Sequence, residues 1–192
     1  MSETEEVSFQ HEFSFEIQFL VIQNHTFTIR GIGQAKRDLL DNLKEKLAPE
    51  DHDIPHSAVR QVDWIYNDLK AAANHTALVS LVTRIDHWTR KLVMRLSLVT
   101  NRKLPPVTRD MQALNDHLGN APIPVEFFTE LVTARDSVVH ADSQAEWQHN
   151  GKRCVAPRYA KDGKLRFTES DLNDALSKAE IQIEWYDKRT PK

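Results

Sequence analysis

The stretch Pro124–Ala141 reads PVEFFTELVTARDSVVHA and carries most of what this sequence says about fold and function. Its apolar residues recur every three or four positions, which predicts an amphipathic helix. On a helix that turns about 100° per residue, the residues within roughly 60° of Arg135 are all apolar: Phe128, Leu131, Val132 and Val139. Arg135 therefore lies in the middle of the apolar arc, where a leucine would be expected.

A buried guanidinium needs a partner because it cannot lose its proton. Arg135 either makes a structural salt bridge or extends its stem to the surface, or the arc faces a second subunit with a polar cleft along the seam. His140 lies about 140° from Arg135 and about 7.5 Å further along the axis. The two would meet at one substrate if the helix frays at its end or if two copies face each other. Asp136 would orient the His140 imidazole or make an ordinary surface contact.

Arg135, followed directly by Asp136 and then by His140 after three more residues, resembles the R-[N/D/H]-x3-H motif of the HEPN superfamily. HEPN proteins are small α-helical domains, and many are metal-independent ribonucleases of toxin–antitoxin, phage-defence and CRISPR-associated systems. The context TARDSVVHAD is similar to family members, and the resemblance covers roughly residues 57–187. HEPN toxins paired with a nucleotidyltransferase often carry a tyrosine two residues after the histidine. Asp142 departs from that pattern, so this subtype is not indicated.

The resemblance implies a metal-independent endoribonuclease of the toxin or phage-defence kind, which uses the RNA 2′-hydroxyl as nucleophile and leaves a 2′,3′-cyclic phosphate. His140 would move the proton, Arg135 would stabilise charge on the phosphate, and Asp136 would hold the imidazole or polarise Arg135. No metal and no cofactor are expected. In this family two protomers commonly form one composite active site, so we expect a homodimer that acts on RNA. An antitoxin or a defence protein would be a further partner.

Two other functions fit the same residues. A HEPN-like module without turnover would bind nucleic acid or partner a toxin, with the motif kept as a buried polar contact at a dimer seam. A purely structural helical dimer would use Arg135 in a salt bridge and His140 as a cap or surface residue.

The composition indicates one ordinary globular domain of 192 residues, of which 40% are hydrophobic and 28% charged. The single cysteine, Cys154, excludes an intramolecular disulfide and fits a reducing cytoplasm. No apolar run approaches the roughly 18 residues of a membrane span, and the acidic start is not that of a signal or transit peptide. We therefore expect a cytoplasmic protein that does not associate with membranes.

Charge is unevenly distributed along the chain, although the net charge is only −3. Residues 1–16 carry five glutamates and no basic residue, whereas residues 84–109 carry seven Lys or Arg against Asp86 alone. Arg84, Lys91 and Arg95 lie along one face of a predicted helix. This face is either a solvated basic surface or a cradle that draws RNA toward Arg135 and His140.

Apolar and polar residues alternate at the start of the chain, which predicts a β-strand over residues 7–22 and a short second strand over 27–29. The competing helical interpretation uses a stripe of four residues: Phe9, Phe13, Ile17 and Leu20. Helices are predicted over residues 34–47, 57–73, 75–99, 108–118, 124–141 and 170–187. A hairpin turning at Lys161-Asp162-Gly163 joins predicted strands over 153–159 and 164–167, after a loop at 147–151.

The expected fold is mainly α, a HEPN-like helical bundle with a minor β part formed by the N-terminal strands and the late hairpin. Residues 1–56 would form a segment of strand and helix packed on a helical domain of residues 57–192. The hairpin is an insertion in that domain near residues 153–167, with which the N-terminal strands would pair.

Overall fold

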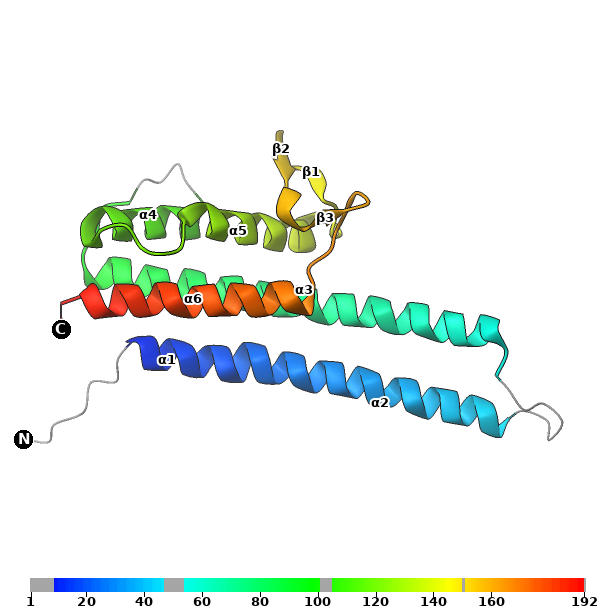
Figure 1. Cartoon of the computed structure of the whole chain (residues 1–192). Helices are drawn as coiled ribbons and strands as arrows, with labels where there is room; N and C mark the ends of the chain where they lie inside the picture. Colours follow the sequence, from blue (N-terminus) through cyan, green and yellow to red (C-terminus); the bar gives the residue numbers. More distant parts are fainter. Residues whose placement is uncertain (1–8, 47–53, 101–104, 150, 192) are drawn as a thin grey trace, which may run out of the picture.

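The computed structural model describes residues 9–46, 54–100, 105–149 and 151–191. Across these ranges the chain is mostly helical, with two short antiparallel hairpins, and the expected mainly α fold with a minor β part is confirmed. The helices pack lengthwise, and the first and last described residues lie at the same end of the molecule (Figure 1).

The N-terminal segment is helical, so the prediction of strands over 7–22 and 27–29 was wrong for the residues described. Helix α1 (Phe9–Glu16), the π-helix η1 (Ile17–Gln23) and α2 (Asn24–Glu45) follow one another without a break and form what we call the N-terminal rod (Figure 1). Phe13 and Ile17 are buried, whereas the side chain of Phe15 is 62% exposed. The odd-numbered apolar residues therefore divide between two helix faces, and their alternation only resembled a strand.

The predicted helices over 57–73 and 75–99 are a single helix of 40 residues, α3 (His56–Arg95). Asn74 lies between the two predicted helices, and this residue type often caps a helix. In the structure the Asn74 Oδ1 atom instead lies 2.7 Å from Nε2 of His25 in α2, so its side chain joins two helices. α3 is thereby long enough to run beside every other helix.

The core surrounds the second half of α3. Helices α4 (Pro106–Leu118), α5 (Val125–His140) and α6 (Glu169–Arg189) pack there together with α1, as Figure 1 shows. Trp88 of α3 is completely buried, and its ring meets that of Phe13 edge-on at 6.3 Å. The first half of α3 and most of α2 extend beyond α4–α6 as a two-helix arm (Figure 1).

Two hairpins follow α5. Strand β1 (Glu146–His149) pairs with β2 (Lys152–Val155), and β3 (Ala160–Lys161) pairs with β4 (Lys164–Leu165) after the 3-10 turn η2 (Pro157–Tyr159). The predicted turn at Asp162-Gly163 is confirmed. Residues 153–155, however, pair with residues 146–148, which overlap the predicted loop at 147–151, and not with residues 164–167. Ala156 donates its amide to Ala145 and the next residue, Pro157, has no amide proton, which ends the strand early. The N-terminal strands cannot pair with this hairpin, because that segment is helical.

Candidate functional site at the end of α5

Helix α5 buries most of the arc that contains Arg135. Phe128, Leu131 and Val132 are buried, whereas Val139, one turn after Arg135, is 52% exposed. The Arg135 side chain itself keeps 29% of its surface exposed. The guanidinium thus lies where the buried arc of α5 meets solvent, and its apolar neighbours hold the stem in place.

The partner of Arg135 is the next residue in the chain. Its Nε atom lies 2.7 Å from Oδ1 of Asp136, although this buried Nε makes no hydrogen bond of good geometry. The Asp136 side chain is 38% exposed. A close, poorly aligned ion pair balances the charge of Arg135 while satisfying only part of its hydrogen-bonding capacity.

His140 is the last residue of α5 and is exposed to solvent. After it the chain turns back sharply, because the amides of Ala141 and Ser143 both donate to the carbonyl oxygen of Ser137, at 3.0 and 3.1 Å. Asp142 and Ser143 adopt left-handed conformations with φ of 48° and 58°. This turn holds the end of the helix against the body of the protein, and His140 is exposed just before it.

A histidine that the sequence interpretation missed lies beside this turn. The Nδ1 atom of His75, in the middle of α3, is 3.2 Å from the hydroxyl oxygen of Ser143. Burial, and secondarily the positive charge of Arg166, lower the pKa of His75, so its imidazole is uncharged at neutral pH. His75 fell at the assumed junction of two helices, where periodicity gives no direction for a side chain. Only the continuity of α3 reveals which way it points.

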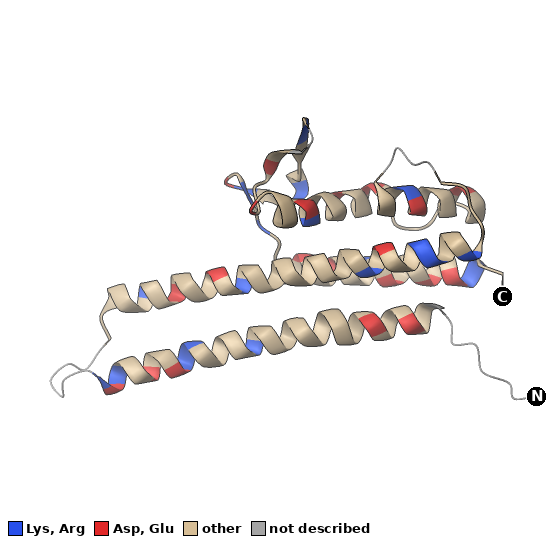
Figure 2. Ribbon diagram, turned by 180° about the vertical axis from the view of Figure 1, so that it is seen from behind, with Lys and Arg blue, Asp and Glu red and all other residues tan. Residues whose placement is uncertain are grey.

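The basic residues predicted to bind RNA lie on a different face of α3. Arg84 is 3.4 Å from Glu16, and Lys91 is 3.8 Å from Glu12 and 4.1 Å above the Trp88 ring. Arg95 donates to the carbonyl oxygen of Pro191 at 3.3 Å. All three basic residues are between about 160° and 200° round α3 from His75. The structure therefore turns them toward α1 and the chain end rather than toward the end of α5. Figure 2 marks the Lys and Arg positions along the ribbon in blue.

A polar pocket of about 340 Å³ opens at the other end of α5, between that helix and α4. Thr108, Asn115 and Glu126 are among its lining residues, and none of the motif residues reaches it. Throughout the described ranges, each helix is too short or too polar to cross a lipid bilayer.

Comparison with protein families, with curated proteins and with solved structures yielded no match to this chain. The candidate site therefore rests on its own geometry: Arg135 with Asp136, the exposed His140, and the uncharged His75 beside the turn that follows.

Proposed function

We propose that this protein is a metal-independent endoribonuclease of the toxin or phage-defence type. The observation that carries the proposal is the partly exposed side chain of Arg135, at the edge of the buried arc of α5, about one and a half turns before the exposed His140. A permanent cation and an imidazole, which can both accept and donate a proton, supply the two functions that cleavage of an RNA phosphodiester requires. The proposal places the enzyme in the cytoplasm, with an antitoxin or a defence protein as its regulator.

The reaction needs no nucleophile from the protein. The RNA 2′-oxygen attacks the adjacent phosphorus as its proton passes to an imidazole, and the bond to the 5′-oxygen breaks as that oxygen takes up a proton. The products are a 2′,3′-cyclic phosphate and a 5′-hydroxyl. His140 exchanges these protons, and Arg135 stabilises the charge that builds on the non-bridging oxygens. Because Asp136 contacts Nε, a phosphate would use the two terminal nitrogens of Arg135.

Two copies of the chain complete the site. Within one α5 helix, Arg135 and His140 project about 140° apart, too far round to grip one phosphate. A twofold arrangement lets Arg135 of one protomer face the imidazole of the other. The basic residues Arg84 and Lys91 have no part in this core chemistry, because RNA would have to displace Glu16 and Glu12 to reach them.

The test is cleavage of structured RNA by the purified protein in excess EDTA. We expect a 2′,3′-cyclic phosphate terminus by mass spectrometry and no cleavage of the 2′-deoxy substrate. Arg135→Ala and His140→Ala should each lower the rate at least 100-fold with circular dichroism unchanged. His117→Ala is the matched control, since His117 is also an exposed histidine in the last turn of a helix. RNA that is bound and never cut supports the non-catalytic module instead.

A further inference from the structure

Large apolar side chains are exposed mainly along the N-terminal rod and the first half of α3. Eight of the thirteen that the described ranges expose belong to the N-terminal rod and the first half of α3: Phe15, Phe19, Leu20, Phe27, Leu39, Trp64, Ile65 and Leu69. Exposed apolar residues gathered in this way mark a contact surface. The two-helix arm, which α4, α5 and α6 leave uncovered, carries most of them (Figure 1).

Four residues form a stripe along α3 on this surface: Ile65, Leu69, Ala72 and Thr76, which we call the α3 stripe. Their spacing of four, three and four residues continues back through Val62 and Ala58, and such a heptad pattern is typical of a helix that packs lengthwise against another. Ile65 and Leu69 are 46% and 45% exposed, and Ala72 and Thr76 are also exposed. The α3 stripe therefore has the pattern of a packed helix while half of its apolar surface faces solvent.

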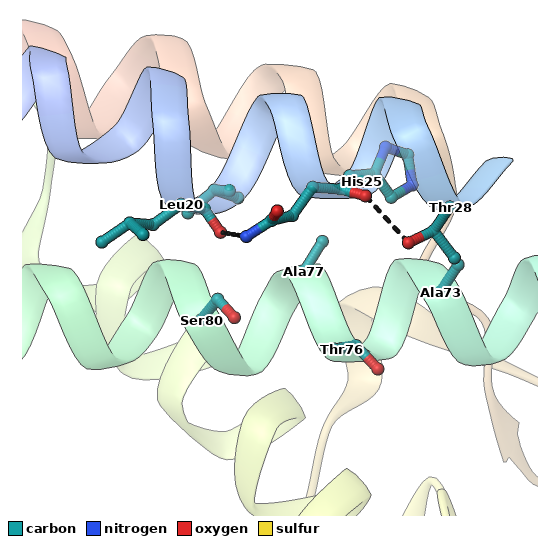
Figure 3. Close-up of a pocket in the computed structure, with 9 residues that line it drawn as sticks. Leu20, His25, Thr28, Ala73, Thr76, Ala77 and Ser80 are labelled. Carbon is teal, nitrogen blue, oxygen red and sulfur yellow. Dashed lines mark hydrogen bonds between the residues drawn. The ribbon is translucent and has the colours of Figure 1, made fainter. Parts of the chain in front are cut away.

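A pocket of about 140 Å³ lies beside the α3 stripe, between the N-terminal rod and α3. Leu20 and Thr28 line it from the rod, and Ala73, Ala77 and Ser80 line it from α3 (Figure 3). Thr28 donates its hydroxyl to the carbonyl oxygen of Asn24 at 2.8 Å, so this polar group is already satisfied within its own helix. A cavity of about 150 Å³ accommodates benzene, so this pocket suits one apolar side chain.

We propose that a second copy of this chain docks here, with the two α3 helices antiparallel about a twofold axis at Ala72. The axis relates position 69 to position 75, so Leu69 of each copy lies opposite the segment with Ala73 and Ala77 that lines the other copy's pocket. Each copy thus presents both the projecting side chain and the pocket that receives it. Such reciprocal contacts are the property of an isologous interface.

Charge favours a copy of the chain over nucleic acid or a membrane. No Lys or Arg belongs to the α3 stripe or lines the pocket, which disfavours phosphate backbones and anionic membranes. A twofold axis at Ala72 pairs residues 64–80 of the two copies, which is about 24 Å of α3, and two helices side by side are about 20 Å wide. The surface offers roughly 480 Å² per copy, the size of a weak and transient interface.

This pairing has a consequence for the site at the end of α5, and that consequence alone rests on the proposed function. His75 of each copy lies about 4.5 Å from Ala72 along the helix axis of α3. His75 also contacts the turn after α5. The twofold axis lies in the plane of the interface and is perpendicular to both α3 helices. It therefore keeps the two α5 helices on the same side of the α3 pair. The ends of α5 from both copies would then approach each other, as a composite site needs.

The experiment measures the mass of the full chain in solution by analytical ultracentrifugation. We expect a dimer, and Leu69→Glu should raise its dissociation constant at least 100-fold with circular dichroism unchanged. Ile181→Glu is the matched control, because Ile181 is 44% exposed, almost the same as Leu69, but belongs to α6 and lies outside the proposed contact surface. Its dimer should persist. A monomeric wild-type chain, or a dimer indifferent to Leu69→Glu, overturns the interface.

A second variant locates the axis. In a Cys154→Ser background, Ala72→Cys should form a disulfide-linked dimer under mild oxidation, because a residue on the axis faces its own copy. Thr83→Cys, also exposed, should stay unlinked, since its two copies would be about 33 Å apart. Linkage at 83 and not at 72 overturns the proposed register. A dimer of this geometry that cuts no RNA overturns the ribonuclease and leaves the interface standing.

Discussion

The hydroxyl oxygen of Ser143 lies 3.2 Å from Nδ1 of His75, a contact between residues 68 positions apart in the chain. It ties the turn after α5 to the middle of α3. Left-handed conformations at Asp142 and Ser143 cost roughly 1–3 kcal/mol each. The turn persists because it is held on both sides, since the Ser143 amide donates to Ser137 and the Ser143 carbonyl accepts from Leu165 at 2.7 Å.

His75 makes stability depend on pH. Its pKa is lowered by burial and by Arg166, so the unfolded chain takes up a proton more readily than the folded protein. The contribution of His75 to the free energy of unfolding is complete above the ordinary histidine pKa of about 6.5. It is lost as the pH falls from there toward the lower pKa that His75 has in the folded protein. We expect His75→Gln to flatten the fall in the free energy of unfolding between about pH 7 and 5. Urea titrations at several pH values measure this, and a variant whose slope equals that of the wild type would contradict it.

Asp110 is the most costly charge to disturb. Its carboxylate is fully buried on α4 and accepts from Nε of Arg90 at 2.5 Å and from Nε of Arg109 at 2.8 Å. The Arg90 side chain is 44% exposed and that of Arg109 is 14% exposed, so water compensates part of their charge once the carboxylate is removed. Asp110→Ala should therefore lower the free energy of unfolding by about 1–3 kcal/mol. Asp116→Ala, on an exposed position of the same helix, should change it by less than about 0.5 kcal/mol. A loss at Asp110 no larger than that at Asp116 would contradict the buried network.

The pair of Arg84 and Glu16 should contribute modestly to the packing of α1 on α3. The two side chains are 34% and 27% exposed and 3.4 Å apart, and Glu16 also accepts from the Trp88 indole at 3.1 Å. A double-mutant cycle of Arg84→Gln and Glu16→Gln should give a coupling of about 0.5–1 kcal/mol that declines with added salt. Zero coupling at low salt would mean that Arg84 does not hold α1.

The sequence predicted local structure well in segments where the apolar residues follow one clear periodicity. The bounds of α5 and α6 agree with the prediction to within two residues, because each helix has a single apolar stripe with clear ends. It failed in α1 and η1, where Phe15 and Phe19 are exposed and mimic strand alternation. It also failed at Asn74, whose side chain contacts His25 and does not cap a helix. The contact of His75 with Ser143 could not be predicted, since no local signal connects residues so distant in the chain. The basic stripe was correctly placed on one face, but which helix covers that face depends on tertiary packing.

Phe13 and Phe15 provide a direct test of the N-terminal rod. In a strand both would point to the same side, whereas in the helix Phe13 is fully buried against Trp88 and Phe15 is 62% exposed. Phe13→Ala should therefore lower the free energy of unfolding by about 3–5 kcal/mol, and Phe15→Ala by less than about 1 kcal/mol. Urea-induced unfolding followed by tryptophan fluorescence measures both, because Trp88 reports on the same contact. Equal losses in the two variants would mean that residues 9–16 do not pack as a helix, and the pairing of Glu12 and Glu16 with the basic face of α3 would be wrong as well.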